Sequence, residues 1–284
     1  MKLFVAEYAG YCFGVQRAMD IIDKAQAVTE GPVFTLGPII HNSRVVSSLE
    51  ERGIMPAVDM DQDFPPGACV ILPSHGTPPP VVEKLQLRGV KVIDAACPRV
   101  LAVHKRVRRA LAQSRTVFLA GDPGHTETAA SAAIDPAHTH VVSTPDDVHR
   151  IDPSGEPAFL AAQTTFSRTV FREVRSELSR RIQDLDVFDS ICSHTRHAQN
   201  AAAALAAQCD VMIIAGGRKS ANTRRLREVC RAAGVRVRCV EAASELRRAM
   251  FRQTDRVGIT AGASTPCAHI HEIKDWLCAR FEID

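Results

Sequence analysis

The sequence lacks the features that mark membrane and exported proteins. Apolar residues make up 45% of its 284 residues, yet no stretch approaches the roughly 18 consecutive apolar residues of a transmembrane helix. The N-terminus has no positively charged segment followed by an apolar run, which is the pattern of a signal peptide. We therefore expect a cytoplasmic globular protein with no membrane among its partners.

An excess of one charge is missing as well. The formal net charge is only +3, too small to make nucleic acid the default partner. We interpret the basic run from Lys105 to Arg115 as a solvated helix face, with a docking patch as the alternative. No GxGxxG fingerprint follows any strand-like run, so the sequence does not predict a bound flavin or nicotinamide.

Cysteine, in contrast, is plentiful. The chain has nine cysteines, and an odd number without a secretion signal argues against a disulfide framework. Metal or redox chemistry is the remaining interpretation for some of them. Six lie in apolar or helical surroundings and are interpreted as small hydrophobic side chains: Cys69, Cys209, Cys230, Cys239, Cys267 and Cys278.

The other three cysteines end three similar segments. LFVAEYAGYC, VIDAACPRV and VFDSICSHT each run from an apolar strand to a cysteine, and a helical pattern follows. A second strand then ends in a glycine 24 or 25 residues after the cysteine. A polar side chain stands four residues past each glycine. The three sets, in chain order, are Cys12, Gly37 and His41; Cys97, Gly121 and His125; Cys192, Gly216 and Ser220.

A third strand in each unit also ends in polar residues. VILPSHGTPP carries Ser74 and His75, AFLAAQTTFS carries Thr164 and Thr165, and VGITAGASTP carries Ser264. Strands that alternate with helices predict parallel sheets whose ligand loops lie at the carboxyl ends of the strands. We expect an α/β trefoil of three βαβ-type domains, residues 1–97, 98–191 and 192–284, related by a pseudo-threefold axis around a central metal site.

Three converging thiolates predict an iron–sulfur cluster. Structural zinc needs four ligands, usually in close CxxC pairs, and Cys12, Cys97 and Cys192 have no such partner cysteines. A four-iron cluster accepts widely spaced cysteines, and three ligands leave one iron open to substrate. We expect a 4Fe-4S centre that performs chemistry rather than electron transfer alone.

The loops around this centre are rich in hydrogen-bond donors, which suit a phosphate or diphosphate. These are His41, His75, His125, Ser220, Asn222 and Ser264. Any one histidine alone fits a core or surface role, but repeated positions favour a ligand site. Glu127 is a carboxylate that stands two residues after His125. We interpret it as a proton donor, with stabilisation of the helix start as the alternative.

Nine motifs together resemble a known family. GYCFGV, IIHNSRVV, SHGTPPPV, DAACPRVLAVHKRV, GHTE, AQTT, DSICSHTRHAQ, GRKSANTRRL and TAGASTP follow in this order over essentially the whole chain. The sequence resembles the 4-hydroxy-3-methylbut-2-enyl diphosphate reductases (IspH or LytB type) of the non-mevalonate isoprenoid pathway. The resemblance implies an oxygen-sensitive 4Fe-4S cluster on the same three cysteines. It also implies two-electron, two-proton removal of the substrate hydroxyl, which gives isopentenyl and dimethylallyl diphosphate.

The resemblance also assigns roles to single residues. The six donors above fall on the family's diphosphate contacts, while Thr164 lies near the substrate hydroxyl and Glu127 feeds the proton. Glu127, Thr164 and His125 form the predicted catalytic group. Electrons then come from a ferredoxin or flavodoxin, docked on the basic helix after Cys97 or at Arg224, Arg225 and Arg227.

Three departures from the family pattern leave alternatives open. Ala221 stands where many members have a second serine, Thr126 replaces a usual proline, and Ala96 replaces a usual threonine. One alternative is a divergent paralogue that reduces a related allylic diphosphate. Others are a non-catalytic regulator or electron carrier that bears the cluster, and a nucleotide- or diphosphate-binding protein whose cysteines are incidental.

Overall fold

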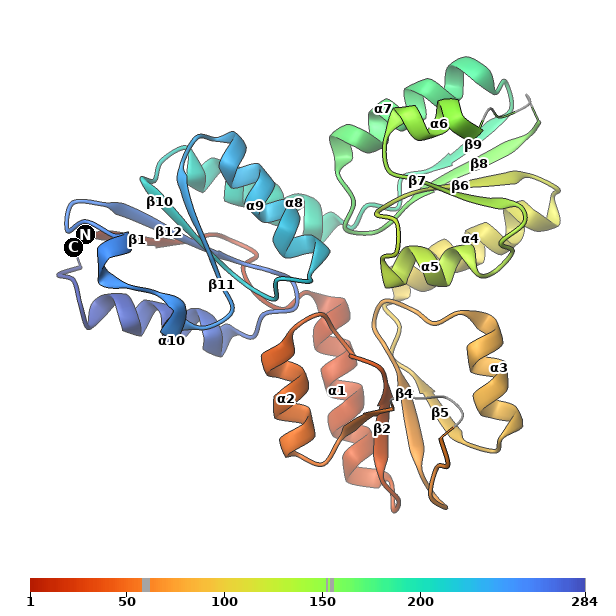
Figure 1. The fold of residues 1–284 in the computed structure, drawn as a ribbon, viewed down its shortest axis with the longest axis horizontal. Helices are drawn as coiled ribbons and strands as arrows, with labels where there is room; N and C mark the ends of the chain where they lie inside the picture. The colour runs from red at the N-terminus through yellow and green to blue at the C-terminus, as the bar shows by residue number, and fades with distance from the viewer. Residues whose placement is uncertain (58–61, 152, 154–155, 284) are drawn as a thin grey trace. The chain divides into compact units, whose positions relative to one another are not determined.

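The fold is built from three four-stranded sheets in which all paired strands are parallel (Figure 1). A computed structural model describes residues 1–57, 62–151, 153 and 156–283. α-Helices connect most of the strands, so the predicted α/β class with three parallel sheets is confirmed. The chain divides into two compact units, residues 17–39 with 49–192 and residues 1–16 with 40–48 and 193–284.

Residues 17–39 and 49–192 contain two of the sheets. The first has the order β3-β2-β4-β5 and the second the order β7-β6-β8-β9. The strands of the first are β2 (Val33–Leu36), β3 (Met55–Ala57), β4 (Cys69–Leu72) and β5 (Lys91–Asp94). Those of the second are β6 (Thr116–Ala120), β7 (Thr139–Val142), β8 (Ala158–Ala162) and β9 (Leu185–Phe188).

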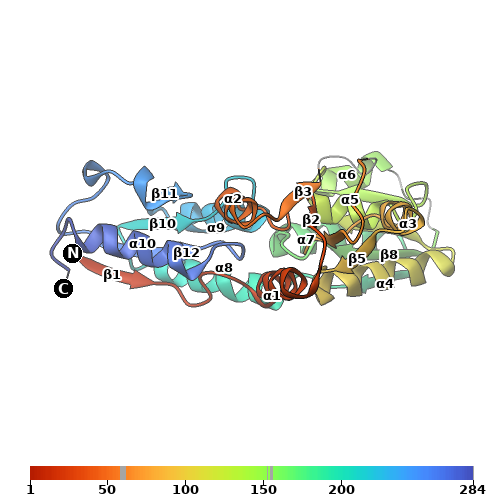
Figure 2. The ribbon, with the colours of Figure 1, turned by 90° about the horizontal axis from the view of Figure 1, so that it is seen from below.

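The remaining unit contains the third sheet, and the N-terminal strand completes it. Its order is β1-β12-β10-β11, formed by β1 (Lys2–Val5), β10 (Val211–Ala215), β11 (Arg236–Val240) and β12 (Arg256–Ala261). The amino group of Met1 donates to the Glu282 carbonyl over 2.7 Å, and the two termini lie side by side (Figure 2). The boundary drawn from the sequence kept residues 1–97 together, whereas β1 pairs with β12 near the other end of the chain.

All three sheets share one strand order. The strand that ends in the repeated glycine is internal, and its neighbours are the next strand of the chain and the one after that. The strand that leads to a cysteine lies at one edge. This order places a topological switch point between the two internal strands, where ligands bind in open parallel sheets. The edge strands β3, β7 and β11 were not predicted from the sequence.

Helices cover both faces of the β6–β9 sheet, as Figure 1 shows. On one face lie α4 (Pro98–Ala112) and α5 (Thr126–Ala132); on the other lie α6 (Pro145–Ile151) and α7 (Arg168–Arg181). Strands β6 and β8 are buried on both faces, so their sequences are continuous apolar runs. Val117 and Leu119 of β6 pack toward α4, whereas Phe118 and Ala120 pack toward α7.

The β1-β12-β10-β11 sheet is covered in the same way. Apolar side chains of α8 (Ser193–Ala206) and α9 (Ala221–Ala232) form one core with Met212 and Ile214. Helix α10 (Cys267–Cys278) packs with Ile213 and Ala215 on the other face. The other helices are α1 (Phe13–Val28), α2 (Ser43–Glu51), α3 (Pro79–Leu87) and two short 3-10 helices, Ala243–Glu245 and Arg248–Met250. No helix in the described part of the chain is long and apolar enough to cross a membrane.

Candidate functional site

The three predicted cysteine ligands have the same backbone environment. Each cysteine N–H donates to a carbonyl in the neighbouring loop, and each acceptor is the second residue after a strand. The pairs are Cys12 with Ala263 after β12 (3.1 Å), Cys97 with Ser74 after β4 (2.9 Å) and Cys192 with Thr164 after β8 (2.9 Å). The repeat found in the sequence is therefore also a repeat of hydrogen bonds.

The aspartate of the two Asp-x-x-Cys motifs shapes the loop before the cysteine. Asp94 accepts the N–H of Ala96 through Oδ1 over 2.8 Å, and Asp189 accepts the N–H of Ile191 over 3.3 Å. A side chain that bonds to the backbone two residues ahead forms an Asx turn. This turn explains why both strand-like runs end with an aspartate three residues before the cysteine.

Cys97 and Cys192 lie in the same compact unit, and their thiols interact electrostatically. Burial raises the pKa of the Cys97 thiol, the N–H groups of Arg99 and Val100 lower it, and the Cys192 charge raises it. Both side chains are half-buried. Two half-buried thiols that interact with each other suit a shared metal centre. Among the described residues, no three His, Cys, Asp or Glu side chains form a ligand set for a single ion.

Glu127 and Thr164 form a buried acid–hydroxyl pair. The Thr164 N–H donates to Oε1 of Glu127 over 2.7 Å, and the Thr164 hydroxyl donates to Oε2 over 2.8 Å. Glu127 is 4% exposed, and the space beside it is only about 10 Å³, room for at most one water. Burial raises the pKa of Glu127 to about 7, against the opposing effect of the two bonds from Thr164.

Gln163 and Thr128 hold the two loops that carry this pair. Gln163 accepts the N–H of Asp122 over 2.9 Å and the hydroxyl of Thr128 over 3.2 Å. A Cβ at Gly121, the last residue of the repeated strand motif, would lie 2.9 Å from the Thr128 hydroxyl. Gly121 therefore lets α5 approach the strand ends closely enough for Glu127 to reach Thr164.

His125 precedes α5 and has a defined tautomer. Its Nδ1 accepts the N–H of Glu127 over 3.2 Å, so the neutral ring carries its proton on Nε2. The ring is partly exposed, and His75, in the loop after β4, is partly exposed in the same unit. A ring N–H that is fixed in this way is a donor suited to a phosphate oxygen.

The other unit contains His41 and Ser264, which are linked through the backbone. The Ser264 hydroxyl donates to the His41 carbonyl over 3.4 Å, and Asn42 donates through Nδ2 to the Ser264 carbonyl over 2.8 Å. Burial lowers the pKa of His41, and the nearby Lys219 charge lowers it further. His41 is therefore a neutral imidazole at physiological pH.

Ser220 and Asn222 lie at the start of α9 in this unit. The Ser220 hydroxyl accepts the N–H of Thr223 over 3.3 Å and caps the helix. Asn222 is 3% exposed, and neither atom of its amide meets a hydrogen-bond partner within the described part of the chain. Buried polar groups rarely stay unpaired in native proteins, so this amide fits a ligand. Asn222 and Glu127 stand at equivalent positions, each six residues after the repeated glycine.

Comparison with known proteins identifies the family. The family model described as LytB protein matches residues 3–278. The chain belongs to the LytB family. A LytB relative from Aquifex aeolicus, named 4-hydroxy-3-methylbut-2-enyl diphosphate reductase, is 38% identical, with 96% of this chain and 95% of the relative covered. A relative of the same name from Alkaliphilus oremlandii is 36% identical over 97% of this chain and 98% of that relative.

Two solved LytB structures have the same fold. The structure of (E)-4-hydroxy-3-methyl-but-2-enyl diphosphate reductase, the terminal enzyme of the non-mevalonate pathway, is 36% identical and gives a TM-score of 0.73. The match covers 98% of this chain and all of that one. The Plasmodium falciparum reductase gives a TM-score of 0.92 over 99% of this chain and 91% of that chain. At 24% identity, this second likeness concerns the fold alone.

Several residues that position the candidate site were not predicted from the sequence. Besides Gln163 and Thr128, Ser190 is buried two residues before Cys192; its hydroxyl accepts the Ala162 N–H over 2.7 Å and donates to the Ala162 carbonyl over 2.6 Å. The only sign of these residues in the sequence was their position close to the repeated cysteines and glycines. Cys239, Cys267 and Cys278, which were interpreted as small hydrophobic side chains, are exposed.

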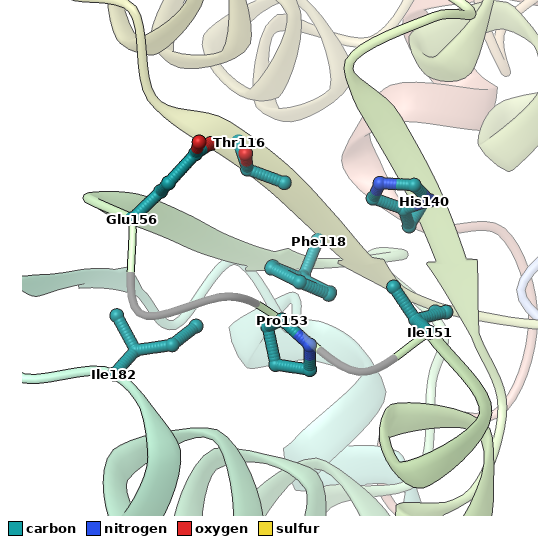
Figure 3. A pocket seen from close by; sticks show the side chains of 7 residues that line it. All are labelled: Thr116, Phe118, His140, Ile151, Pro153, Glu156 and Ile182. Carbon is teal, nitrogen blue, oxygen red and sulfur yellow. The ribbon is translucent and has the colours of Figure 1, made fainter.

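Two cavities in the LytB chain lie away from the predicted residues. One, of about 190 Å³, is surrounded by Thr116, Phe118, His140, Ile151, Pro153, Glu156 and Ile182 (Figure 3). The other, of about 520 Å³, shares Thr116 and Glu156 with it. Both lie at the amino ends of β6 and β8, opposite the loops that hold Glu127 and Thr164. We therefore assign the candidate site to the carboxyl ends of the strands.

Burial of Glu127 predicts a pH-dependent stability difference between wild type and Glu127→Gln. Its pKa is about 7 in the fold, against the ordinary value of 4.5, so the folded state binds more protons between these values. Stability of the wild type relative to the variant therefore falls as pH rises from about 5 to about 8, by about 3 kcal/mol. Urea unfolding of both metal-free proteins measures it, and a constant difference would contradict a buried, raised carboxyl.

Proposed function

We propose that this chain catalyses the reductive dehydroxylation of 4-hydroxy-3-methylbut-2-enyl diphosphate to isopentenyl and dimethylallyl diphosphate. Its LytB relatives are named as this reductase. The Glu127–Thr164 pair is the observation that carries the proposal. With a pKa of about 7, Glu127 is partly protonated at neutral pH. An electron carrier has no need of a buried proton donor bonded to a hydroxyl, whereas removal of a hydroxyl as water requires a proton.

The LytB family depends on an iron–sulfur cluster, and we assign its ligands to Cys12, Cys97 and Cys192. The support is the shared backbone environment of the three cysteines and the interaction between the thiols of Cys97 and Cys192. When bound, a 4Fe-4S cluster with three protein ligands supplies the electrons and an iron without a protein ligand to activate the substrate hydroxyl.

Six donors bind the diphosphate in this proposal: His41, His75, His125, Ser220, Asn222 and Ser264. His125 offers Nε2–H because its Nδ1 is already an acceptor. Asn222 offers a buried amide that has no other partner among the residues described. Hydrogen bonds to a charged oxygen are stronger than those between neutral groups, which suits these side chains to a diphosphate.

Glu127 and Thr164 move the proton. In the protonated acid, the carboxyl O–H donates to Oγ1 of Thr164, and the Thr164 hydroxyl then donates its own proton to the departing oxygen. Glu127 is left as a carboxylate that accepts the N–H and O–H of Thr164, the arrangement that the structure describes. The two bonds stabilise this product state, so the transfer needs no movement of the backbone.

The decisive experiment is anaerobic turnover. The cluster is reconstituted, the substrate is added with reduced viologen, and viologen oxidation is followed together with product analysis. Formation of both five-carbon diphosphates supports the proposal. No turnover by a protein with an intact cluster would assign the activity to a related allylic diphosphate, and a folded, iron-free protein that binds diphosphates would refute the cluster.

Restoring the family's second serine should strengthen substrate binding. Ala221 is buried between Ser220 and Asn222 at the start of α9, and Ala221→Ser adds a donor to the diphosphate site. A charge-assisted hydrogen bond contributes about 1.5 to 3 kcal/mol, so KM should fall by roughly ten-fold or more. Ala232→Ser, at the other end of α9, is the matched control. An unchanged KM for Ala221→Ser would show that a water or a neighbour already fills this position.

We assign the electron supply to a ferredoxin or flavodoxin. The chain has no flavin or nicotinamide fingerprint, so the electrons come from a separate donor. Small donors of this type carry a negative surface, and positive surfaces on their partners steer the encounter. The sequence left two docking faces open, the helix after Cys97 and the arginines of α9.

The cytoplasmic location stays a prediction.

A further inference from the structure

We infer that the acidic electron-donor protein docks on the exposed face of α4, and not on α9. This inference rests on the proposed function, because it names the partner surface of the same site. The α4 basic face comprises Leu101, Lys105, Arg106, Arg108 and Arg109, all of which are exposed.

The helix separates its apolar and basic residues clearly. Val103, Val107 and Ala110 are buried against the β6–β9 sheet, and Val100 and His104 are buried beside Gly76 in the loop after β4. Leu101, Lys105, Arg108 and Arg109 follow the spacing of one helix face on the opposite side. Leu101 is 39% exposed although it is a large aliphatic residue. Small transient interfaces often have an apolar centre and a charged rim. Leu101 would be the centre here, and the surrounding cations would be the rim.

The positive charges of the α4 basic face are not neutralised by neighbouring carboxylates in the described part of the chain. In the residues that the structure describes, none of Lys105, Arg106, Arg108 and Arg109 forms an ion pair with a carboxylate. On α9, in contrast, Arg225 pairs with Glu228 over 2.9 Å, and Arg224, Arg225 and Arg227 are all partly buried. Unpaired exposed cations keep their charge available for a partner. This difference favours α4 among the two faces that the sequence left open.

The α4 basic face is also connected to two predicted cluster ligands. Cys97 is the N-cap of α4, and its carbonyl accepts the N–H of Leu101 over 3.0 Å. The guanidinium of Arg106 lies 5.2 Å from the centre of the Phe188 ring, and Phe188 ends β9 four residues before Cys192. The α4 basic face therefore belongs to the helix that Cys97 begins, and through Arg106 it contacts the strand that leads to Cys192.

An acidic protein fits this surface better than nucleic acid. The net charge of the whole chain is only +3, whereas nucleic-acid binding generally requires a broad basic surface. Electrostatic attraction to a small acidic donor raises the rate of encounter without a large interface. We therefore propose an electron-transfer protein as the partner. Binding to a DNA duplex is measured alongside it as the competing possibility.

Charge reversal with two kinds of reductant tests the assignment. The variant is Arg108→Glu with Arg109→Glu, and the matched control is Arg172→Glu with Arg175→Glu. The control pair is exposed on α7, which covers the opposite face of the same sheet, and changes the net charge equally. With a reduced bacterial ferredoxin at low salt, we expect the α4 variant to lose roughly ten-fold or more in kcat/KM, and the control to stay within about two-fold. Turnover with reduced viologen should not change in either variant.

Three results would overturn the inference. The first is an equal loss in both charge-reversed proteins, which would indicate net charge alone. The second is an equal loss with ferredoxin and viologen in the α4 variant. The third is tighter binding of a DNA duplex than of ferredoxin to the wild type, lost on reversal at Arg108 and Arg109.

Binding separates this inference from the proposed function. Affinity of the cluster-loaded protein for oxidised ferredoxin is measured by calorimetry, without any substrate. Weaker binding by the α4 variant alone supports the docking face even where 4-hydroxy-3-methylbut-2-enyl diphosphate is not reduced. Equal binding by the wild type, the α4 variant and the α7 control refutes the docking face, whatever the outcome of the turnover assay.

Discussion

Glu127→Gln should reduce turnover by roughly 10²- to 10⁴-fold while the cluster spectrum stays unchanged. Glutamine has nearly the same shape as glutamate. It can still accept the Thr164 N–H through its amide oxygen, so the loop geometry of the wild type is kept. It carries no acidic proton, and the Thr164 hydroxyl then has no source from which to replace the proton it donates. The rate is measured with reduced viologen, and the cluster by absorption and iron content.

The pH profile adds a second readout for the same substitution. Because the acid must be protonated before turnover, kcat/KM of the wild type should fall as pH rises through about 7, the pKa of Glu127. The residual rate of the variant should lack this falling limb. Glu177→Gln is the matched control, since Glu177 is the other buried glutamate of this unit and bonds to Arg180 and Arg181. Full activity of Glu127→Gln would end the assignment of Glu127 as proton donor.

The sequence predicted the three parallel sheets because cysteines and glycines mark the strand ends. Gly121 and Gly216 are required where α5 and α9 approach the strands, and a Cβ at Gly216 would lie 2.5 Å from the Thr223 hydroxyl. In the first repeat no atom of the described residues crowds Gly37, and its φ of +64° is the conformation that favours glycine there. The same spacing led from the cysteines to the polar residues after the glycines.

The edge strands and the partner of β1 could not be predicted in this way. Strand β3 has only three residues, and β11 carries Arg236 and Arg238 among its five, so neither has the apolar pattern of a strand. Pairing of β1 with β12 joins segments about 250 residues apart, and local sequence does not specify such a partner. These strands were missed because their pairing depends on tertiary structure.

The properties of Glu127 likewise depend on tertiary contacts. The sequence showed a single carboxylate near the start of a helix, which fits both a proton donor and a helix-stabilising residue. The adjacency of β6 and β8 places it against Thr164, and burial then raises its pKa. A buried, hydrogen-bonded acid differs from an exposed residue at a helix start. The position equivalent to it in the third repeat is Asn222, which offers a neutral amide in place of an acid.

Cys97→Ser and Cys192→Ser should each prevent stable cluster assembly and lower turnover by at least about 100-fold, because a serine hydroxyl is a poor iron ligand in place of a thiolate. The same result is expected for Cys12→Ser. The fold should be retained, since each cysteine is held through its backbone N–H and the bonds to Ala263, Ser74 and Thr164 do not involve sulfur. Iron and sulfide per chain after anaerobic reconstitution, together with the unfolding transition, measure the two effects separately.

The six other cysteines provide the control. Cys278 ends α10 and is exposed, so Cys278→Ser removes a thiol without reaching any of the three strand-end loops. We expect full iron content and wild-type turnover for this variant. Cys230→Ser is a stricter control, because Cys230 is fully buried in the α8–α9 core and its loss tests whether a folding defect alone lowers iron content. If Cys97→Ser retained the iron of the wild type while Cys230→Ser lost it, the three-cysteine assignment would be wrong. Iron loss restricted to the Cys12, Cys97 and Cys192 variants would identify the ligands directly, because it separates coordination from stability.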